Sequence, residues 1–270
     1  MSNPANKKKK KIKPIPKPYL KGNAVSGLVV TRGLKLMVYP VIFILINLFV
    51  GAAFSFEGSL FLRVLFNVAL VLFCGLLLYT NGQNTGYGDI TLAEIMYNHV
   101  QEGKEVSARD RDRCYHPLKG LTTALVGYLP FLILSLVYAL TVKRQQFALP
   151  ALPSWVGAFE GERDFMLPLQ YYQATEPFTA GVVLRVIMRL LLYPYINLVG
   201  ARNASLTLLV DRLSPLALLV PYLGYIVGYL RGRHSRAMLH GSMAAADRKK
   251  RRKARMAARK AKAKSKTELV

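Results

Sequence analysis

The sequence predicts an all-α protein, a polytopic bundle of transmembrane helices with disordered basic tails. Hydrophobic residues make up 52% of the 270 residues, and they are gathered into continuous runs rather than spread along one face of amphipathic segments. Runs of this kind are typical of helices in lipid, because a bilayer core requires about 20 consecutive apolar residues per crossing. The net charge of +24 lies almost wholly at the two ends of the chain. We therefore expect a basic arm at 1–33, a membrane domain at 34–230 and a basic tail at 231–270.

The N-terminal arm is predicted to be disordered and solvated. The first 35 residues contain ten Lys or Arg and no acid, and Pro14, Pro16 and Pro18 follow the run of lysines. A segment with this charge and so few apolar residues cannot bury a core.

The first two apolar runs, 34–54 and 60–80, are predicted to form a helical hairpin in the membrane, because only a short turn separates them. A polar loop is expected at 81–118, since this stretch opens with Asn-Gly-Gln-Asn and ends with alternating charges. One short amphipathic helix could form within the loop, at 91–100.

The segment Thr85-Gly-Tyr-Gly-Asp89 in this loop resembles the selectivity filter of potassium channels over about five residues. A filter follows a short pore helix and precedes a membrane span, whereas here a full-length apolar run precedes the segment and a polar stretch follows it. Asn84 also replaces the usual threonine. A flexible turn after a helix end is the simpler interpretation of Gly86 and Gly88.

Three further apolar runs follow along the chain, at 121–142, 178–200 and 213–230. Between the first two lies a loop at 143–177 that is rich in proline and aromatic residues and holds Trp155, the single tryptophan. Aromatic rings of this kind gather at the bilayer interface.

The orientation prediction conflicts with the number of apolar runs. Residues 231–270 hold fifteen Lys or Arg against Asp247 and Glu268, so both tails are strongly basic. Because basic flanks stay on the cytoplasmic side, both tails should be cytoplasmic, which requires an even number of crossings. Five apolar runs give an odd number. Either 178–200 is an interfacial helix, leaving four spans, or a sixth, short or re-entrant segment exists between 143 and 188.

A weak internal repeat bears on this choice. Lys35-Leu-Met-Val-Tyr-Pro40 is similar to Arg189-Leu-Leu-Leu-Tyr-Pro194, and both are followed by Asn-Leu and Val-Gly-Ala. If the two helices correspond, Arg189 lies at a cytoplasmic helix end, as Lys35 does, which favours six segments. Tyr-Pro in an apolar context is common, so coincidence is the other interpretation.

Arg185 and Arg189 stand four residues apart on one face of an otherwise apolar run. Arginine within a bilayer is costly, so such residues face a bundle interior, an aqueous cavity or the headgroups. They are candidates for lining a solute pathway, and snorkelling to the interface is the structural alternative.

The segment 107–116 combines potential metal ligands, but its pattern favours another interpretation. Asp110, Asp112, Cys114 and His116 could in principle bind a metal, yet Asp alternates with Arg through 109–113. This alternation is typical of self-neutralising surface charge. No catalytic constellation, metal site or cofactor motif is recognisable, so no cofactor is predicted and a non-enzymatic role is favoured.

The polybasic runs are the strongest functional signal. Clusters of this kind next to a membrane attract anionic lipid headgroups, and the same cations can bind RNA phosphates. The C-terminal run has cations on all sides of a helical wheel, so it is not an amphipathic, lipid-inserting helix. The candidate partner-binding residues are Lys7, Lys8, Lys9, Lys10, Lys11, Arg248, Lys249, Lys250, Arg251, Arg252 and Lys253.

The sequence thus predicts a multi-pass membrane protein, placed by its simple loops in a bacterial cytoplasmic membrane, whose cytoplasmic tails bind anionic lipid or RNA. In composition alone, the C-terminal tail is similar to the ribosome-docking tails of membrane-protein insertases, and this resemblance implies RNA of a membrane-bound ribosome as a partner. The alternative function is a small transporter or channel component with Arg185 and Arg189 in its pathway.

Overall fold

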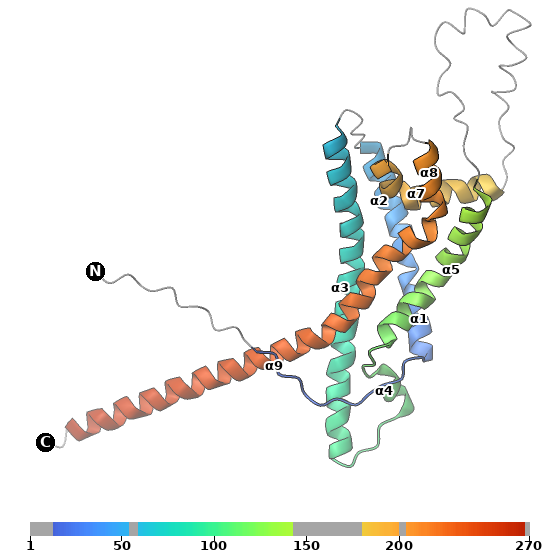
Figure 1. Ribbon diagram of the computed structural model, residues 1–270. Helices are drawn as coiled ribbons and strands as arrows, with labels where there is room; N and C mark the ends of the chain where they lie inside the picture. Colours follow the sequence, from blue (N-terminus) through green and yellow to red (C-terminus); the bar gives the residue numbers. More distant parts are fainter. Residues whose placement is uncertain (1–12, 54–58, 143–179, 200–203, 268–270) are drawn as a thin grey trace, which may run out of the picture. The chain divides into compact units, whose positions relative to one another are not determined.

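The computed structural model describes residues 13–53, 59–142, 180–199 and 204–267, and within these ranges all regular structure is helical. The predicted loop at 143–177, including Trp155, lies outside the described residues, as do the lysines at 7–11. The helices, labelled in Figure 1, are α1 (Gly27–Leu36), α2 (Val38–Ala53), α3 (Leu60–Gln101), α4 (Ala108–Arg113), α5 (Lys119–Thr141), α7 (Ala180–Val199), α8 (Ala204–Arg212) and α9 (Ser214–Thr267).

By length and composition, four helical stretches in the described part of the chain could cross a membrane, and a fifth is possible. The four are Gly27–Phe49, which combines α1 and most of α2, together with α3, α5 and α7. The fifth is the pair α8 and α9, which bends by 56° where the two helices meet. All-helical architecture with several apolar, membrane-length helices is therefore confirmed.

The chain divides into two compact units. Unit 1 comprises Met1–Val29, Tyr79–Thr122 and Tyr225–Val270, and unit 2 comprises Val30–Leu78 and Thr123–Gly224. Helices α1, α3, α5 and α9 each have one end in each unit, whereas α2, α7 and α8 belong wholly to unit 2.

The polar stretch at the start of the predicted loop is helical, so the expectation of a loop from residue 81 was wrong. Helix α3 runs unbroken from Leu60 to Gln101. Gly82 and Gly86 serve packing rather than a turn, because a Cβ at either would collide with the backbone of α9 at Tyr225 or Tyr229, whereas Gly88 has open space around it. The same fact excludes a potassium-filter conformation for residues 85–89, which are part of the helix.

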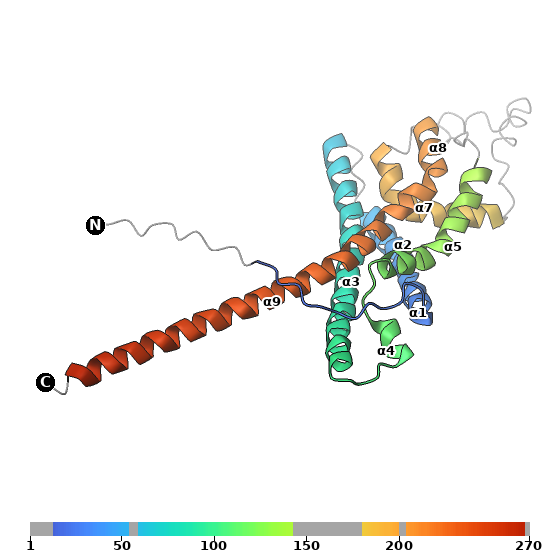
Figure 2. The ribbon, with the colours of Figure 1, turned by 60° about the horizontal axis from the view of Figure 1, so that its bottom comes forward.

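The glycines on α9 have the same four-residue spacing as those on α3. Gly228 and Gly232 lie so close to α3 that a side-chain carbon would overlap its backbone near Tyr79 and Tyr87. Glycines four residues apart on one helix face allow two backbones to approach closely. Figures 1 and 2 both show α9 crossing α3 here and then continuing to the C-terminal end of the chain.

The N-terminal arm is held against unit 1 over its described part, which corrects the prediction of a solvated arm to residue 33. Residues 13–26 have no regular secondary structure, and α1 begins at Gly27. Tyr19 and Leu20 are half-buried and pack against the core of unit 1, which is formed by Ile90, Ala93, Cys114, Tyr115 and Tyr229.

The C-terminal tail is not the disordered segment that the fold prediction expected. Helix α9 continues from its apolar start to Thr267 without a break. Alanine alternates with Lys and Arg beyond residue 243, and all three residue types have high helix propensity. From Arg231 to Thr267 the helix extends about 55 Å at 1.5 Å per residue.

Candidate functional site

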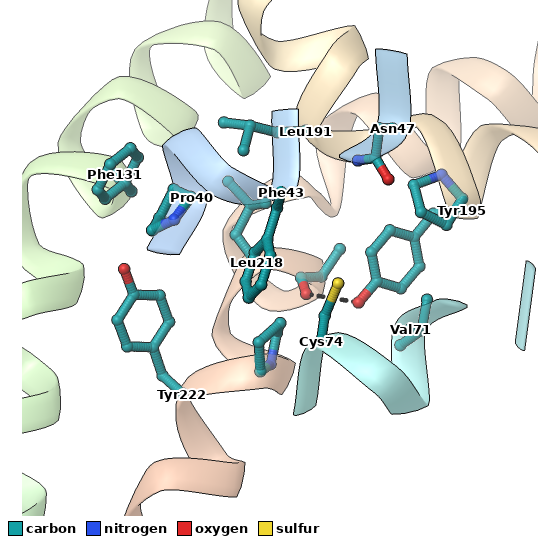
Figure 3. A pocket seen from close by; sticks show the side chains of 13 residues that line it. Pro40, Phe43, Asn47, Val71, Cys74, Phe131, Leu191, Tyr195, Leu218 and Tyr222 are labelled. Carbon is teal, nitrogen blue, oxygen red and sulfur yellow. Dashed lines mark hydrogen bonds between the residues drawn. The ribbon is translucent and has the colours of Figure 1, made fainter. Parts of the chain in front are cut away.

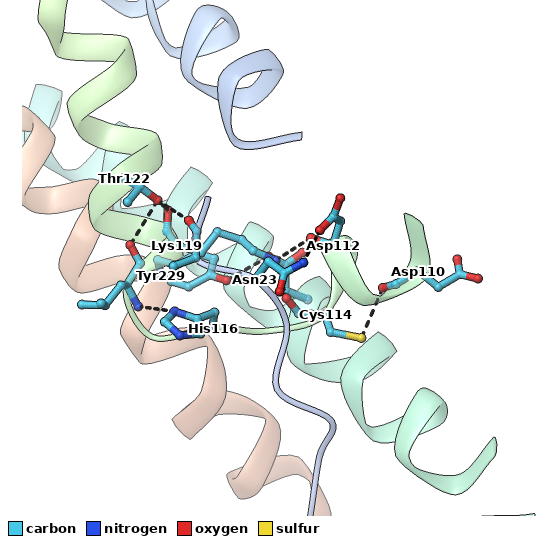
Figure 4. A network of polar contacts seen from close by, with 11 residues as sticks. Asn23, Asp110, Asp112, Cys114, His116, Lys119, Thr122 and Tyr229 are labelled. Atoms are coloured by element: carbon cyan, nitrogen blue, oxygen red, sulfur yellow. Dashed lines mark hydrogen bonds and ion pairs between the residues drawn. The ribbon is translucent and has the colours of Figure 1, made fainter. Parts of the chain in front are cut away.

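A buried ion pair lies at the centre of unit 1. The Lys119 ammonium, with a fully buried side chain, is 3.7 Å from an Asp89 carboxylate oxygen. It also donates hydrogen bonds to the carbonyls of Asp112 and Cys114, the first at 2.8 Å. The Tyr229 hydroxyl donates to the same Asp89 oxygen at 2.9 Å. Lys119 therefore links α5 to α3, to the end of α4 and to the residue that follows α4, and Tyr229 adds α9 (Figure 4).

The residues of 107–116 that could have bound a metal have structural roles instead. Ser107 caps α4 by accepting from the Asp110 backbone N–H at 3.1 Å, and Asp112 accepts from the Asn23 side chain at 2.7 Å. The Cys114 thiol donates to the Asp110 carbonyl (Figure 4), and burial raises its pKa. Nowhere in the described ranges do three or more His, Cys, Asp or Glu side chains gather as metal ligands would.

A second polar cluster joins α3 to the base of the C-terminal extension of α9. Glu94 accepts from the Arg236 guanidinium at 3.0 Å, and both of its oxygens lie within 3.0 Å of His240 Nε2. Arg236 also donates to the Tyr87 hydroxyl at 3.1 Å. Burial opposes the charge on Arg236, but the hydrogen bonds to Tyr87 and Glu94 outweigh it and raise its pKa. These contacts hold α9 against α3 just beyond the glycines at which the two helices cross.

The polybasic run at 248–253 lies on α9 beyond this cluster, and all six side chains are exposed. Successive residues of an α-helix are 100° apart, so six consecutive cations cover every side of the helix. Between residues 243 and 258, Met243 and Met256 are the exposed large apolar side chains that α9 carries. The run is therefore a cationic rod without an apolar face.

In unit 2, Arg189 is paired with an acid that the sequence did not assign to it. Its guanidinium is 3.9 Å from a carboxylate oxygen of Asp211, a residue of α8 whose side chain is 3% exposed. Arg185 lies near enough for its charge to act on the same carboxylate. Tyr138 of α5 also lies beside Asp211 and Arg189. Four buried atoms here form no hydrogen bond of ordinary geometry among the described residues: Arg189 Nε, Asp211 Oδ1, Thr207 Oγ1 and the Tyr138 hydroxyl.

The described parts of the predicted repeat segments lie mainly on two helices that contact each other, α2 and α7, while Lys35 and Leu36 belong to α1. Pro40 and Pro194 line one apolar pocket, shown in Figure 3, and Pro221 of α9 lines it as well. A proline inside a helix leaves the carbonyl four residues earlier without its usual partner. The carbonyl that Pro194 frees, at Leu190, accepts the Asn47 side-chain amide at 2.8 Å.

Pro221 is accommodated in the same way. It frees the carbonyl of Ala217, which accepts a hydrogen bond from the Tyr195 hydroxyl at 3.0 Å, drawn as the dashed line in Figure 3. Side chains from neighbouring helices thus satisfy the backbone at two proline positions of unit 2.

The comparisons with known proteins give no match for this chain: no family model, no curated protein and no solved structure is similar to it. The candidate sites therefore rest on geometry alone. Sequence reasoning missed the network of Asp89, Lys119 and Tyr229 and the cluster around Glu94. The available signal was the spacing of Gly224, Gly228 and Gly232, which predicts a close helix crossing but does not identify its partner helix.

Proposed function

We propose that the chain is a multi-pass membrane protein of the cytoplasmic membrane, without enzymatic activity, whose tails bind phosphate-bearing partners at the cytoplasmic face. The observation that carries the proposal is helix α9, which is continuous from an apolar segment into a run of six exposed cations. In this proposal the apolar start of α9 lies in the membrane, and the same helix continues into the cationic segment that binds polyanions.

The basic residues of the two tails support an even number of crossings. Basic flanks stay on the cytoplasmic side of a membrane, so two basic tails are proposed to lie on the same side. In the described part of the chain, four helical stretches could cross a membrane, and the bent pair of α8 and α9 could be a fifth. An even number therefore requires that one of these five does not cross, or that a further crossing exists.

Salt-dependent binding tests the proposed function. The full chain, held in nanodiscs of neutral lipid, is titrated with anionic vesicles and with RNA. Replacing the six cations at 248–253 with glutamine should weaken binding, and the logarithm of affinity should fall linearly with the logarithm of salt concentration in the unmodified protein. The matched control converts all six to lysine, which retains the charge and should retain most of the binding. Unmodified protein that binds neither vesicles nor RNA would exclude the proposal.

The second candidate function is a solute pathway through unit 2, favoured by the partnerless polar atoms around Arg189 and Asp211. Buried polar groups without partners in a membrane helix bundle are typical of sites that water or a solute occupies. Anion flux into proteoliposomes should fall in an Arg185→Ala variant if this pathway operates. Flux equal to that of empty liposomes for the unmodified protein would exclude it.

A further inference from the structure

Unit 2 contains a cluster of polar side chains contributed by three otherwise apolar helices. Arg185 and Arg189 stand four residues apart on one face of α7, and Thr207 and Asp211 stand four residues apart on one face of α8. Helices α7 and α8 pack against each other, and Tyr138 of α5 lies beside Arg189 and Asp211. The side chains of Tyr138, Thr207 and Asp211 are more than nine-tenths buried. Two cations, one carboxylate and two hydroxyls are thus gathered in one place.

The surroundings of this cluster are apolar. The same helices carry large exposed apolar side chains, among them Leu140 of α5, Ile187 of α7 and Leu209 of α8. In a membrane these side chains face lipid, so the polar groups must neutralise one another or bind polar ligands. A charge added to the cluster is therefore costly unless an opposite charge arrives with it.

The cluster has unused hydrogen-bonding capacity. Asp211 Oδ1, Arg189 Nε, Thr207 Oγ1 and the Tyr138 hydroxyl form no hydrogen bond of ordinary geometry among the described residues. The 3.9 Å between the Arg189 guanidinium and Asp211 is long for a hydrogen bond, so this ion pair is loose. The Arg189 side chain is 35% exposed, against 3% for Asp211. A ligand can therefore reach the guanidinium while the carboxylate stays enclosed.

We propose that this cluster binds a small monocarboxylate together with one proton, which Asp211 takes up. The inference rests on the second candidate function, the solute pathway, and names its substrate class. Once Asp211 is protonated at Oδ1, all four of these atoms are hydrogen-bond donors. A carboxylate offers about four acceptor positions, and a guanidinium binds carboxylates through paired N–H groups. The ligand thus replaces the Asp211 carboxylate as the partner of Arg189.

Charge balance requires that the anion and the proton bind together. Without ligand, Arg189 and Asp211 neutralise each other. The ligand brings one negative charge and the proton, taken from water, brings one positive charge, so the net charge of the cluster is unchanged. In the described part of unit 2, the titratable groups around Asp211 are Arg185 and Arg189 on α7, Tyr138 on α5 and the exposed Arg212 beside it on α8. A carboxylate on Arg189 cancels the charge that keeps Asp211 ionised.

Thermal unfolding of the full chain in detergent tests the site, with sodium acetate as the probe. A ligand that binds only the folded protein raises the melting temperature with its concentration, and this rise gives the dissociation constant. Because one proton accompanies each acetate, the dissociation constant should fall about tenfold for each unit by which pH is lowered between about pH 8 and pH 6. Asp247→Asn, at an exposed acid of α9, is the matched control and should keep this dependence.

Two further variants separate the site from general effects of salt and from misfolding. Asp211→Asn places a neutral amide where the protonated acid would stand, so acetate should bind with an affinity that no longer changes with pH. The double variant Arg189→Gln with Asp211→Asn leaves neither ion without its partner, so it should fold. It lacks the guanidinium and should not bind acetate at any pH.

The possible results separate the site from the pathway. Equal effects of acetate on the unmodified protein and the double variant would overturn the site. A dissociation constant independent of pH, or a pH dependence that Asp211→Asn retains, would overturn proton uptake at Asp211. Acetate binding without anion flux into proteoliposomes would exclude the pathway and support the site, whereas flux without acetate binding would do the reverse. None of these results depends on the basic tails.

Discussion

Lys119 shows how a charged residue can be a core residue of this protein. Its ammonium group is enclosed by one carboxylate and two backbone carbonyls, while Tyr115 and Tyr229 stack in parallel beside it with 5.3 Å between centroids. From the sequence, Lys119 looks like an ordinary cation at the entrance of an apolar run. Its burial depends on Asp89 and Tyr229, which are 30 and 110 residues away along the chain, and no local pattern predicts their meeting.

Removing this ammonium should be costly. In a Lys119→Met variant, Asp89 would remain buried without its counter-charge, and we expect a loss of about 3–5 kcal/mol in the free energy of unfolding. The exposed pair of Lys104 and Glu102 provides the control, because Lys104→Met should cost less than about 1 kcal/mol. Thermal unfolding of the detergent-solubilised proteins measures both, and similar losses for the two variants would contradict the buried pair.

His116 should make unit 1 less stable in mild acid. Burial, Lys21 and Lys119 lower its pKa below 6.5, and its Nδ1 accepts a hydrogen bond from the Leu118 amide at 3.2 Å. As pH falls through 6.5, the unfolded chain takes up a proton at this residue before the folded chain does, so the folded state loses stability. The melting temperature should therefore fall less between pH 7.5 and about 5.5 in a His116→Asn variant. Parallel curves for the two proteins would show that His116 has no such effect.

Among the helices, the crossing of α3 and α9 departs most from what the sequence predicted. Asn81-Gly-Gln-Asn has the composition of a turn, and Gly lowers helix propensity. The tertiary context reverses that preference, since the absence of side chains at Gly82 and Gly86 is what lets α9 pack there. By contrast, the starts and ends of α5 and α7 agree with the predicted runs within two residues, because their apolar character needs no partner to be recognised.

Two glycines on α3 should respond to alanine in opposite directions. A side chain at Gly86 would overlap the backbone of α9 at Tyr229, so Gly86→Ala should destabilise the protein by about 1–3 kcal/mol. Gly88 lies two residues away on the same helix and has open space around it, so Gly88→Ala should be neutral or stabilise by about 0.5–1 kcal/mol. Equal effects on thermal unfolding would contradict the close crossing.

The hydrogen bond that compensates for Pro221 gives a second prediction about helix packing. Tyr195→Phe removes the hydrogen bond to the Ala217 carbonyl and should cost about 1 kcal/mol. In a Pro221→Ala background that carbonyl regains a backbone donor, so the same substitution should cost measurably less. A double-mutant cycle on thermal stability measures this coupling. If the effects of the two substitutions on stability are additive, the Tyr195 hydroxyl does not replace the backbone donor that Pro221 lacks.

At the scale of the whole molecule, composition predicted the class of fold but not the number of membrane crossings. Continuous apolar runs and charge confined to the ends indicated membrane-length helices between basic tails, but they gave an odd number of runs. The ambiguity lay in 178–200, where Arg185 and Arg189 weaken the apolar signal and the partner of Arg189, Asp211, is 22 residues away on α8. The polybasic runs were identifiable from sequence, and the alanine, lysine and arginine of the C-terminal tail favour a helix there. The attachment of the arm was not identifiable.

The sidedness of the two termini tests the account most directly. Protease-cleavable tags are added to both ends of the full chain, and cleavage is compared in right-side-out and inside-out membrane vesicles. If both basic tails are cytoplasmic, as their charge predicts, both tags are cleaved in inside-out vesicles and protected in right-side-out ones. Cleavage of one tag in each preparation would mean an odd number of crossings, and it would contradict the proposal that both basic tails lie on the cytoplasmic face.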